Sequence, residues 1–173
     1  MDRSKLKLEE LNRLSVEEFK SSPKKPLIVV LDNVRSMHNV GAVLRSADAF
    51  SVEKVYLCGI TPKPPHREIR KTAIGAEESV DWEAHPDAGA LVSTLQEQGV
   101  HILALEQAKG SISLAQYEGN SNRSALVIGH EVDGVQQQIV DLADTVLEIP
   151  QYGTKHSLNV SVATGIVMYA LTH

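Results

Sequence analysis

Five short runs of apolar, largely β-branched residues recur along the 173-residue chain, and they constrain its fold more than any other feature. The runs are PLIVVLDNV (26–34), KVYLCGI (54–60), VHILALE (100–106), SALVIGH (124–130) and TVLEIP (145–150). Each has the length of a strand, and continuous apolar character is typical of strands that are covered on both faces. We therefore expect these five runs to be buried strands.

Segments with helical spacing separate these runs. The segment 39–50 carries apolar residues on one face, as does the segment 87–98. The first face consists of Val40, Val43, Leu44, Ala47 and Phe50, and the second of Ala88, Leu91, Val92 and Leu95. Strands that alternate with helices of this length predict an α/β fold, with a mostly parallel sheet flanked by helices.

The first 25 residues differ from the rest of the chain. Leucines recur there at mixed spacings of three and four, and Ser15 with Glu18 forms a capping box that starts a helix. The following SSPKKP segment ends that helix, because proline cannot continue it. We expect a helical extension over 1–25 and one main domain over 26–173.

The C-terminal segment, 158–171, is apolar nearly all round, although it is too short and too interrupted to span a bilayer. Leu158, Val162, Ile166 and Tyr169 recur at helical spacing, which predicts a buried helix of about 15 residues. The sheet can cover only one side of such a helix. We therefore expect a homodimer to cover the other side.

Composition narrows the class of protein. The charged N-terminus lacks the apolar core of a signal peptide, and the single cysteine, Cys58, cannot form an intrachain disulfide. Both features predict a cytoplasmic protein without a membrane anchor. The seven histidines show no HxxxH spacing and the sequence contains no CxxC pair, so we expect no metal site.

The net charge of −5 argues weakly against a nucleic-acid partner, but the segment TPKPPHREIRK (61–71) is locally basic. It carries Lys63, Arg67, Arg70 and Lys71 against a single Glu68. One interpretation is a solvated loop that leads into a polar helix. The other is a loop that binds RNA phosphates.

Polar residues follow the first strand run in DNVRSMHNVGAVLRSADAF. It contains neither the GxGxxG nor the GxxxxGK[ST] pattern, so a nucleotide held through its phosphates is not favoured. Asn39 lies at an expected helix start, Gly41 permits close approach, and Arg45 follows. Either Asn39 caps the helix and Arg45 is solvated, or both residues face a cleft.

Two later loops also concentrate polar residues. In VIGHEVDGV (127–135), two glycines bracket Glu131 in a turn that lacks the ligand spacing of a calcium loop. In IPQYGTKHSLNVSVA (149–163), Ser157 and Asn159 stand where the apolar C-terminal segment begins. Ligands of open α/β sheets bind at the carboxyl ends of strands, where all three loops are expected.

The three loops together resemble the SpoU family of the SPOUT superfamily, which are S-adenosylmethionine-dependent RNA ribose 2′-O-methyltransferases. The resemblance rests on N-x5-R, GxExxG and IPxxGxxxSLNVSVA in this order, hereafter the first, second and third motifs, and it covers about 26–171. It implies a parallel α/β sheet whose C-terminal segment is threaded into a deep trefoil knot. It also implies a homodimer.

Site residues follow from the same resemblance. The S-adenosylmethionine pocket would be lined by Gly129, Ile149 and Leu158, with Leu105 or Glu106 at the edge of a neighbouring loop. The catalytic residues would be Asn39, Arg45, Glu131, Ser157 and Asn159. A guanidinium is normally only a donor, so we expect Arg45 to orient a phosphate or stabilise the developing 2′-oxyanion. Glu131 would hold the first loop or Arg45 in place, while the other polar residues position loop and substrate.

The substrate is expected to be RNA, and tRNA rather than rRNA. The segment EQAKGSISLAQY (106–117) resembles family members that methylate a guanosine ribose in the tRNA D-loop. The alternatives are an rRNA 2′-O-methyltransferase and a non-catalytic RNA-binding protein with the same fold. A base-methylating relative is disfavoured, because those branches lack the pairing of N-x5-R with SLN.

Overall fold

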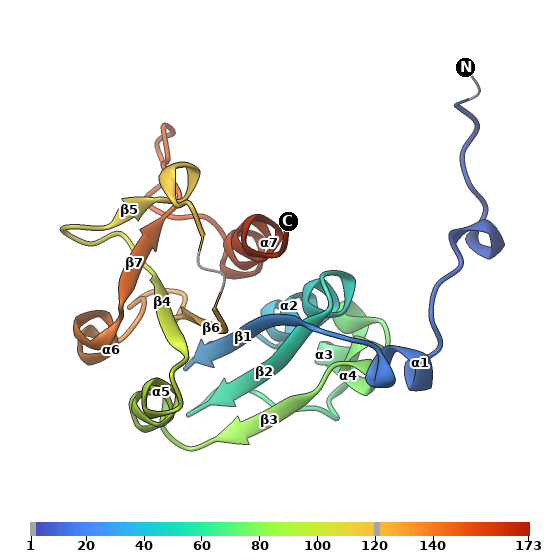
Figure 1. The fold of residues 1–173 in the computed structure, drawn as a ribbon, viewed down its shortest axis with the longest axis horizontal. Helices are drawn as coiled ribbons and strands as arrows, with labels where there is room; N and C mark the ends of the chain where they lie inside the picture. Colours follow the sequence, from blue (N-terminus) through green and yellow to red (C-terminus); the bar gives the residue numbers. More distant parts are fainter. Residues whose placement is uncertain (1–2, 120–121) are drawn as a thin grey trace.

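The computed structural model describes residues 3–119 and 122–173, which form a seven-stranded sheet of order β3-β2-β1-β6-β4-β7-β5 (Figure 1). The strands are β1 (Lys25–Asp32), β2 (Val52–Cys58), β3 (Trp82–His85), β4 (His101–Leu105), β5 (Ile112–Ser113), β6 (Ser124–Ile128) and β7 (Thr145–Glu148). Every pairing is parallel. The predicted parallel α/β fold is confirmed.

Helices cover both faces of the sheet (Figure 1). They are α2 (Met37–Ala49), α3 (Arg67–Ala73), α4 (Ala76–Ser79) and α7 (Val160–Thr172) on one face, and α5 (Ala88–Glu97) and α6 (Gln137–Leu142) on the other. Successive β1 side chains point to opposite faces, so Val29 and Leu31 join the first core, whereas Ile28 and Val30 join the second. This arrangement explains why the strand runs are apolar without alternation.

All five predicted runs contain strands, but two further strands were not predicted. β3 (WEAH) is an edge strand with no fully buried residue, and β5 contains only two residues. Neither strand needs an apolar run, because edge strands face solvent on much of their surface. The pattern used to find the central strands could not detect them.

The N-terminal extension is only partly helical, and Figure 1 shows it leaving the body of the molecule. It contains a 3-10 turn, η1 (Leu8–Leu11), and a short helix, α1 (Val16–Ser21). The capping box is confirmed, because the Glu18 amide donates to Ser15 Oγ at 3.2 Å and Glu18 Oε2 accepts from the Ser15 amide at 2.7 Å.

Helix α7 packs against α2 and β1 through one side only. Thr164, Val167, Met168 and Thr172 are its buried residues. Of the residues predicted to be buried, Val162 (52%), Ile166 (41%) and Tyr169 (58%) lie on the exposed side of α7, and Leu158 (38%) lies just before its first residue. We call these four residues the α7 stripe; the spacing is as predicted, but the chain itself does not cover them. Within the described residues, no helix combines the length and apolar character needed to cross a membrane.

Candidate functional site

A cavity of about 350 Å³ opens at the carboxyl edge of the sheet. Its walls come from the loops that follow β4, β6 and β7, together with the start of α7. These loops meet because parallel strands deliver their carboxyl ends to one edge. The lining contains every residue predicted for the cofactor pocket, namely Leu105, Glu106, Gly129, Ile149 and Leu158, and also Glu131 and Ser157 of the catalytic prediction.

The second-motif loop owes its shape to close backbone approach. A Cβ on Gly129 would lie 2.0 Å from the carbonyl carbon of Gly134 and 2.1 Å from the Val135 amide nitrogen. Reciprocal hydrogen bonds of 3.0 Å between His130 and Gly134 close the turn, and Gly134 has a positive φ of 70°. Both glycines are therefore required to keep this wall of the cavity in place.

Glu131, in the same loop, holds the first motif. Its carboxylate accepts from the backbone amides of Arg35 and Ser36, each at 2.9 Å, and from Asn39 Nδ2 at 3.0 Å. Partial burial opposes ionisation of Glu131, but the hydrogen bonds from these amides and from Asn39 outweigh it and leave its pKa below the ordinary value. Glu131 is thus a fixed anion that orders the loop before α2.

The third motif joins the same network. Asn159 Nδ2 donates to Asn39 Oδ1 at 3.1 Å, across 120 residues of sequence. Asn159 Oδ1 accepts from the Ser161 amide at 2.9 Å and so caps α7. The interpretation of Asn39 as the cap of α2 is wrong, because Ser36 is the cap and Asn39 is an 8%-exposed residue of the first turn. Glu131, Asn39 and Asn159 therefore link the three motifs.

Arg45 lies apart from this network. It is exposed on α2 and does not line the cavity. Its side chain makes no hydrogen bond or ion pair with any residue in 3–119 or 122–173. Its five donors are consequently free to meet a ligand that comes from outside the chain.

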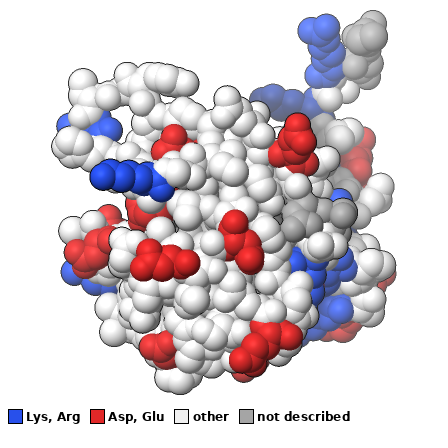
Figure 2. Space-filling model, turned by 60° about the vertical axis from the view of Figure 1, so that its left-hand side comes forward, with Lys and Arg blue, Asp and Glu red and all other residues white. Residues whose placement is uncertain are grey.

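The charged side chains of the described cavity wall are carboxylates. Glu106, Glu131, Asp133 and Glu148 line it, whereas the described lining contains no lysine or arginine. Figure 2 shows acidic side chains spread over one face of the molecule, with basic side chains towards its margins. Such a cavity favours a ligand with net positive charge, as a sulfonium with an ammonium group has.

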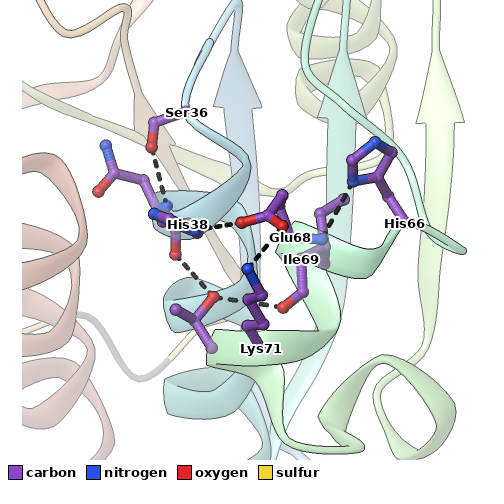
Figure 3. Close-up of polar contacts among 8 residues, drawn as sticks. Ser36, His38, His66, Glu68, Ile69 and Lys71 are labelled. Atoms are coloured by element: carbon purple, nitrogen blue, oxygen red, sulfur yellow. Dashed lines mark hydrogen bonds and ion pairs between the residues drawn. The ribbon is translucent and has the colours of Figure 1, made fainter.

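The basic segment packs through α3 against the start of α2 (Figure 3). Glu68 is central, because its carboxylate contacts His38 Nε2 at 2.9 Å and accepts from Lys71 Nζ at 2.7 Å. Gly41 permits this close packing, since a Cβ there would lie 2.3 Å from the carbonyl oxygen of Ile69. The ion pair with Glu68 thus gives Lys71 a partner within the chain.

Arg70 is also paired, to Glu78 at 2.7 Å and to Glu77 at 3.4 Å. Lys63 and Arg67 are exposed and have no ion pair among the described residues. Of the four cations predicted to bind RNA, these two remain uncompensated. The RNA-binding role of all four stays a prediction.

Sequence reasoning missed Asp32 and the structural role of Glu106, both of which shape the site. Asp32 is 1% exposed at the end of β1 and accepts from Gln136 Nε2 at 2.8 Å. The Glu106 carboxylate accepts from the Val135 amide at 2.9 Å, which makes it a support of the second-motif loop. An acidic residue that ends an apolar strand was the available signal for both. No group of three or more potential metal ligands occurs in the part of the chain that the structure describes.

Replacement of Glu131 by glutamine should lower the free energy of unfolding at pH 7 by about 2 kcal/mol, because hydrogen bonds to a charged acceptor become bonds to a neutral one. The folded-state pKa of Glu131 is lowered, so its contribution is complete above the unfolded pKa and is lost as the pH falls through the folded value. The difference between wild type and variant in urea unfolding should therefore shrink below about pH 4.5. A difference that stays constant down to pH 3 would contradict this assignment.

The fold and the site together define a class: a parallel α/β protein whose ligand cavity is closed by a polar loop leading into the C-terminal helix. Residues 26–169 match the SpoU rRNA Methylase family, and the chain belongs to that family.

Individual relatives include enzymes for two kinds of RNA. The chain is 34% identical over 161 residues to the 23S rRNA (guanosine-2'-O-)-methyltransferase RlmB of Vibrio parahaemolyticus. This alignment covers 92% of the chain and 64% of the relative. It is 34% identical over 160 residues to the tRNA (guanosine(18)-2'-O)-methyltransferase of Aquifex aeolicus, and this alignment covers 89% of the chain and 72% of the relative.

Solved structures show the same architecture. The A. aeolicus TrmH/SpoU tRNA modifying enzyme matches with a TM-score of 0.79 and 32% identity, over 90% of this chain and 78% of that one. The AdoMet-bound rRNA methyltransferase of Sinorhizobium meliloti matches with a TM-score of 0.79 and 27% identity, over 86% and 56%.

Proposed function

We propose that this protein transfers a methyl group from S-adenosylmethionine to the ribose 2′-hydroxyl of a guanosine in RNA. The observation that carries the proposal is the Glu131–Asn39–Asn159 network beside an acidic, glycine-walled cavity. The relatives support it, since those named above are guanosine-2'-O-methyltransferases. The chain spans only 64% of the length of the Vibrio relative. The proposed activity and substrate are therefore argued from the residues that this chain contains.

The cavity suits S-adenosylmethionine, which supplies an electrophilic methyl group when bound. Gly129 allows the close packing that shapes the second-motif wall, while Leu105, Ile149 and Leu158 provide apolar walls for an adenosine. The carboxylates around the cavity complement the cationic part of the ligand.

Arg45 supplies the charge that the acidic cavity lacks. The guanidinium holds an RNA phosphate or stabilises the 2′-oxygen as it loses its proton. Asn39 and Asn159 orient the start of α2, on which Arg45 lies, and Glu131 fixes the loop before that helix. Ser157 lines the cavity and positions the substrate by hydrogen bonding.

We propose tRNA as the first substrate and 23S rRNA as the second candidate. The resemblance of 106–117 to tRNA-modifying members favours tRNA, and the tRNA relative is covered over a larger share of its length than the rRNA relative. The rRNA reading is supported by equal identity to the Vibrio enzyme. We place the protein in the cytoplasm, which the buried, unpaired Cys58 supports.

The test is calorimetric titration with S-adenosylmethionine, followed by methylation of total tRNA and total rRNA with mass-spectrometric mapping of the modified nucleotide. We expect saturable cofactor binding and 2′-O-methylguanosine in tRNA. Methylation of rRNA alone would transfer the proposal to the second substrate. Cofactor binding without methylation of either RNA would make this a non-catalytic member.

We also propose that the C-terminal segment is knotted, as in the family. The 149–159 loop supports this, because Gln107 Nε2 donates to the carbonyl oxygen of His156 at 2.8 Å before the chain returns to α2 as α7.

The α7 stripe is the proposed homodimer interface. Three of its apolar residues recur along the exposed side of α7 and Leu158 lies just before that helix, and burial in a symmetric partner would remove them from water. We expect a dimer by light scattering at micromolar concentration, and a monomer after replacement of Val162 and Ile166 by aspartate.

The control is Ile60→Asp, which places the same charge on another exposed isoleucine, 64% accessible, outside α7. That variant should remain dimeric. A wild-type monomer, or a dimer that survives both α7 substitutions, would exclude this interface.

A further inference from the structure

A second cavity, of about 710 Å³, lies between α3, α4 and the start of β3. Its walls include Pro64 and Pro65 from the loop after β2, Arg67 and Arg70 from α3, Glu77 from α4 and Trp82 from β3. We call it the α3 groove. It shares no lining residue with the cavity at the carboxyl edge of the sheet among the described residues.

Glu77 is the unusual member of this groove. Its side chain is only 9% exposed, and Oε1 lies 3.4 Å from Arg70 Nε. Its other oxygen, Oε2, is buried and lacks a hydrogen-bond partner, the only such side-chain atom found in residues 3–119 and 122–173. A buried acceptor without a donor is costly, and native proteins seldom keep one unless another molecule completes it.

Planar surfaces stand beside this acceptor. Trp82 is half-buried and lines the groove together with Glu77, and its Nε1 donates to the backbone carbonyl oxygen of Glu77 at 3.1 Å, which holds the indole against α4. The guanidinium of Arg70 is 69% exposed and is held by Glu77 and Glu78. Unstacked bases pack on aromatic rings and on guanidinium planes of this kind.

Charge divides the groove into two parts. Arg70 is neutralised by two carboxylates, so its planar face suits a base better than a phosphate. Arg67, by contrast, is exposed and has no ion pair among the described residues, and Lys63 lies nearby in sequence with the same property. This end of the groove suits a phosphate.

The groove is connected to the helix that carries Asn39 and Arg45. His38 contacts Glu68 of α3, and Thr72 Oγ1 of the same helix donates to the His38 carbonyl oxygen at 3.0 Å (Figure 3). A ligand in the groove would therefore contact a helix that packs directly on the helix carrying the first motif.

We propose that the α3 groove binds one nucleotide of the substrate RNA other than the nucleotide that is methylated. The base lies against Trp82 with an N–H donor directed at Glu77, and its phosphate lies at Arg67. The proposal rests on the proposed function, because it takes RNA as the substrate.

The chain contains a single tryptophan, so its fluorescence reports this groove directly. We titrate the full-length protein with unmodified tRNA and expect saturable quenching of Trp82 as a base stacks on it. Arg67→Ala should weaken this binding about fivefold and lower the salt dependence of log K by about one. Lys5→Ala, which removes a charge from the N-terminal extension, should leave both unchanged.

The outcomes separate the groove from the catalytic proposal. Quenching by RNA in the Arg45→Ala variant, with methylation lost, supports the groove independently of turnover. Methylated RNA without any change in Trp82 fluorescence would overturn the groove and leave the proposed function standing. Tighter binding of free 5′-GMP than of tRNA would also overturn it, because the groove would then be a mononucleotide site.

Discussion

Replacement of Arg45 by alanine should lower the methylation rate by about 100- to 1000-fold, the loss that follows removal of one donor aimed at developing negative charge. The affinity for S-adenosylmethionine should stay within a factor of about two, because Arg45 does not line the cavity. The effect on stability should be small, since the side chain is exposed and makes no polar contact with the described residues. Single-turnover methylation with calorimetry measures both quantities.

Arg45→Lys is the matched variant. It keeps the positive charge and loses the planar fork, so it should recover part of the rate if charge alone matters and little of it if two parallel donors are needed. Methylation by Arg45→Ala at more than a tenth of the wild-type rate would remove Arg45 from the catalytic set.

A second large effect is expected at Gly129. Alanine there places a methyl group about where the backbone of Gly134 and Val135 lies, so the second-motif loop must move. We expect a loss of about 1 to 3 kcal/mol from overpacking. Because the displaced loop is a wall of the cavity, calorimetry should show S-adenosylmethionine affinity falling at least about tenfold.

Gly153→Ala provides the control for this experiment. Gly153 lies in the third-motif loop, but a Cβ there meets no atom within 4 Å. Its cofactor affinity and melting temperature should match those of the wild type. Equal losses in both variants would show that general loop flexibility, rather than close packing at Gly129, explains the effect.

The sequence predicts those parts of the fold that follow from burial. Strands such as β1 and β6 lie between two helical layers, and burial on both faces demands the continuous apolar runs that identify them. The face of α2 was likewise predicted correctly, with Val40, Val43 and Leu44 fully buried. The short edge strand β3 has no fully buried residue, so it needs no continuous apolar run and could not be recognised by one.

The site was predicted through resemblance, and the contacts within it were not. Nothing in local spacing indicates that Asn39 bonds to Asn159 rather than capping its own helix, because this contact depends on how α7 returns to α2. Glu131 was expected to hold either the first loop or Arg45. The structure shows that it holds the loop, through the amides of Arg35 and Ser36.

The bond between Asn39 and Asn159 has a consequence for how the molecule is made. The two residues are 120 positions apart, so this contact requires the closure of a long loop and cannot form in a chain that has assembled only its N-terminal elements. A chain that has assembled only β1, β2 and α2 has two of the seven strands and no complete site. S-adenosylmethionine would thus bind only the completely folded protein, and at a concentration 100 times its Kd it would stabilise the folded state by about 2.7 kcal/mol. The ligand that supplies the methyl group would also shift the folding equilibrium towards molecules whose site is complete.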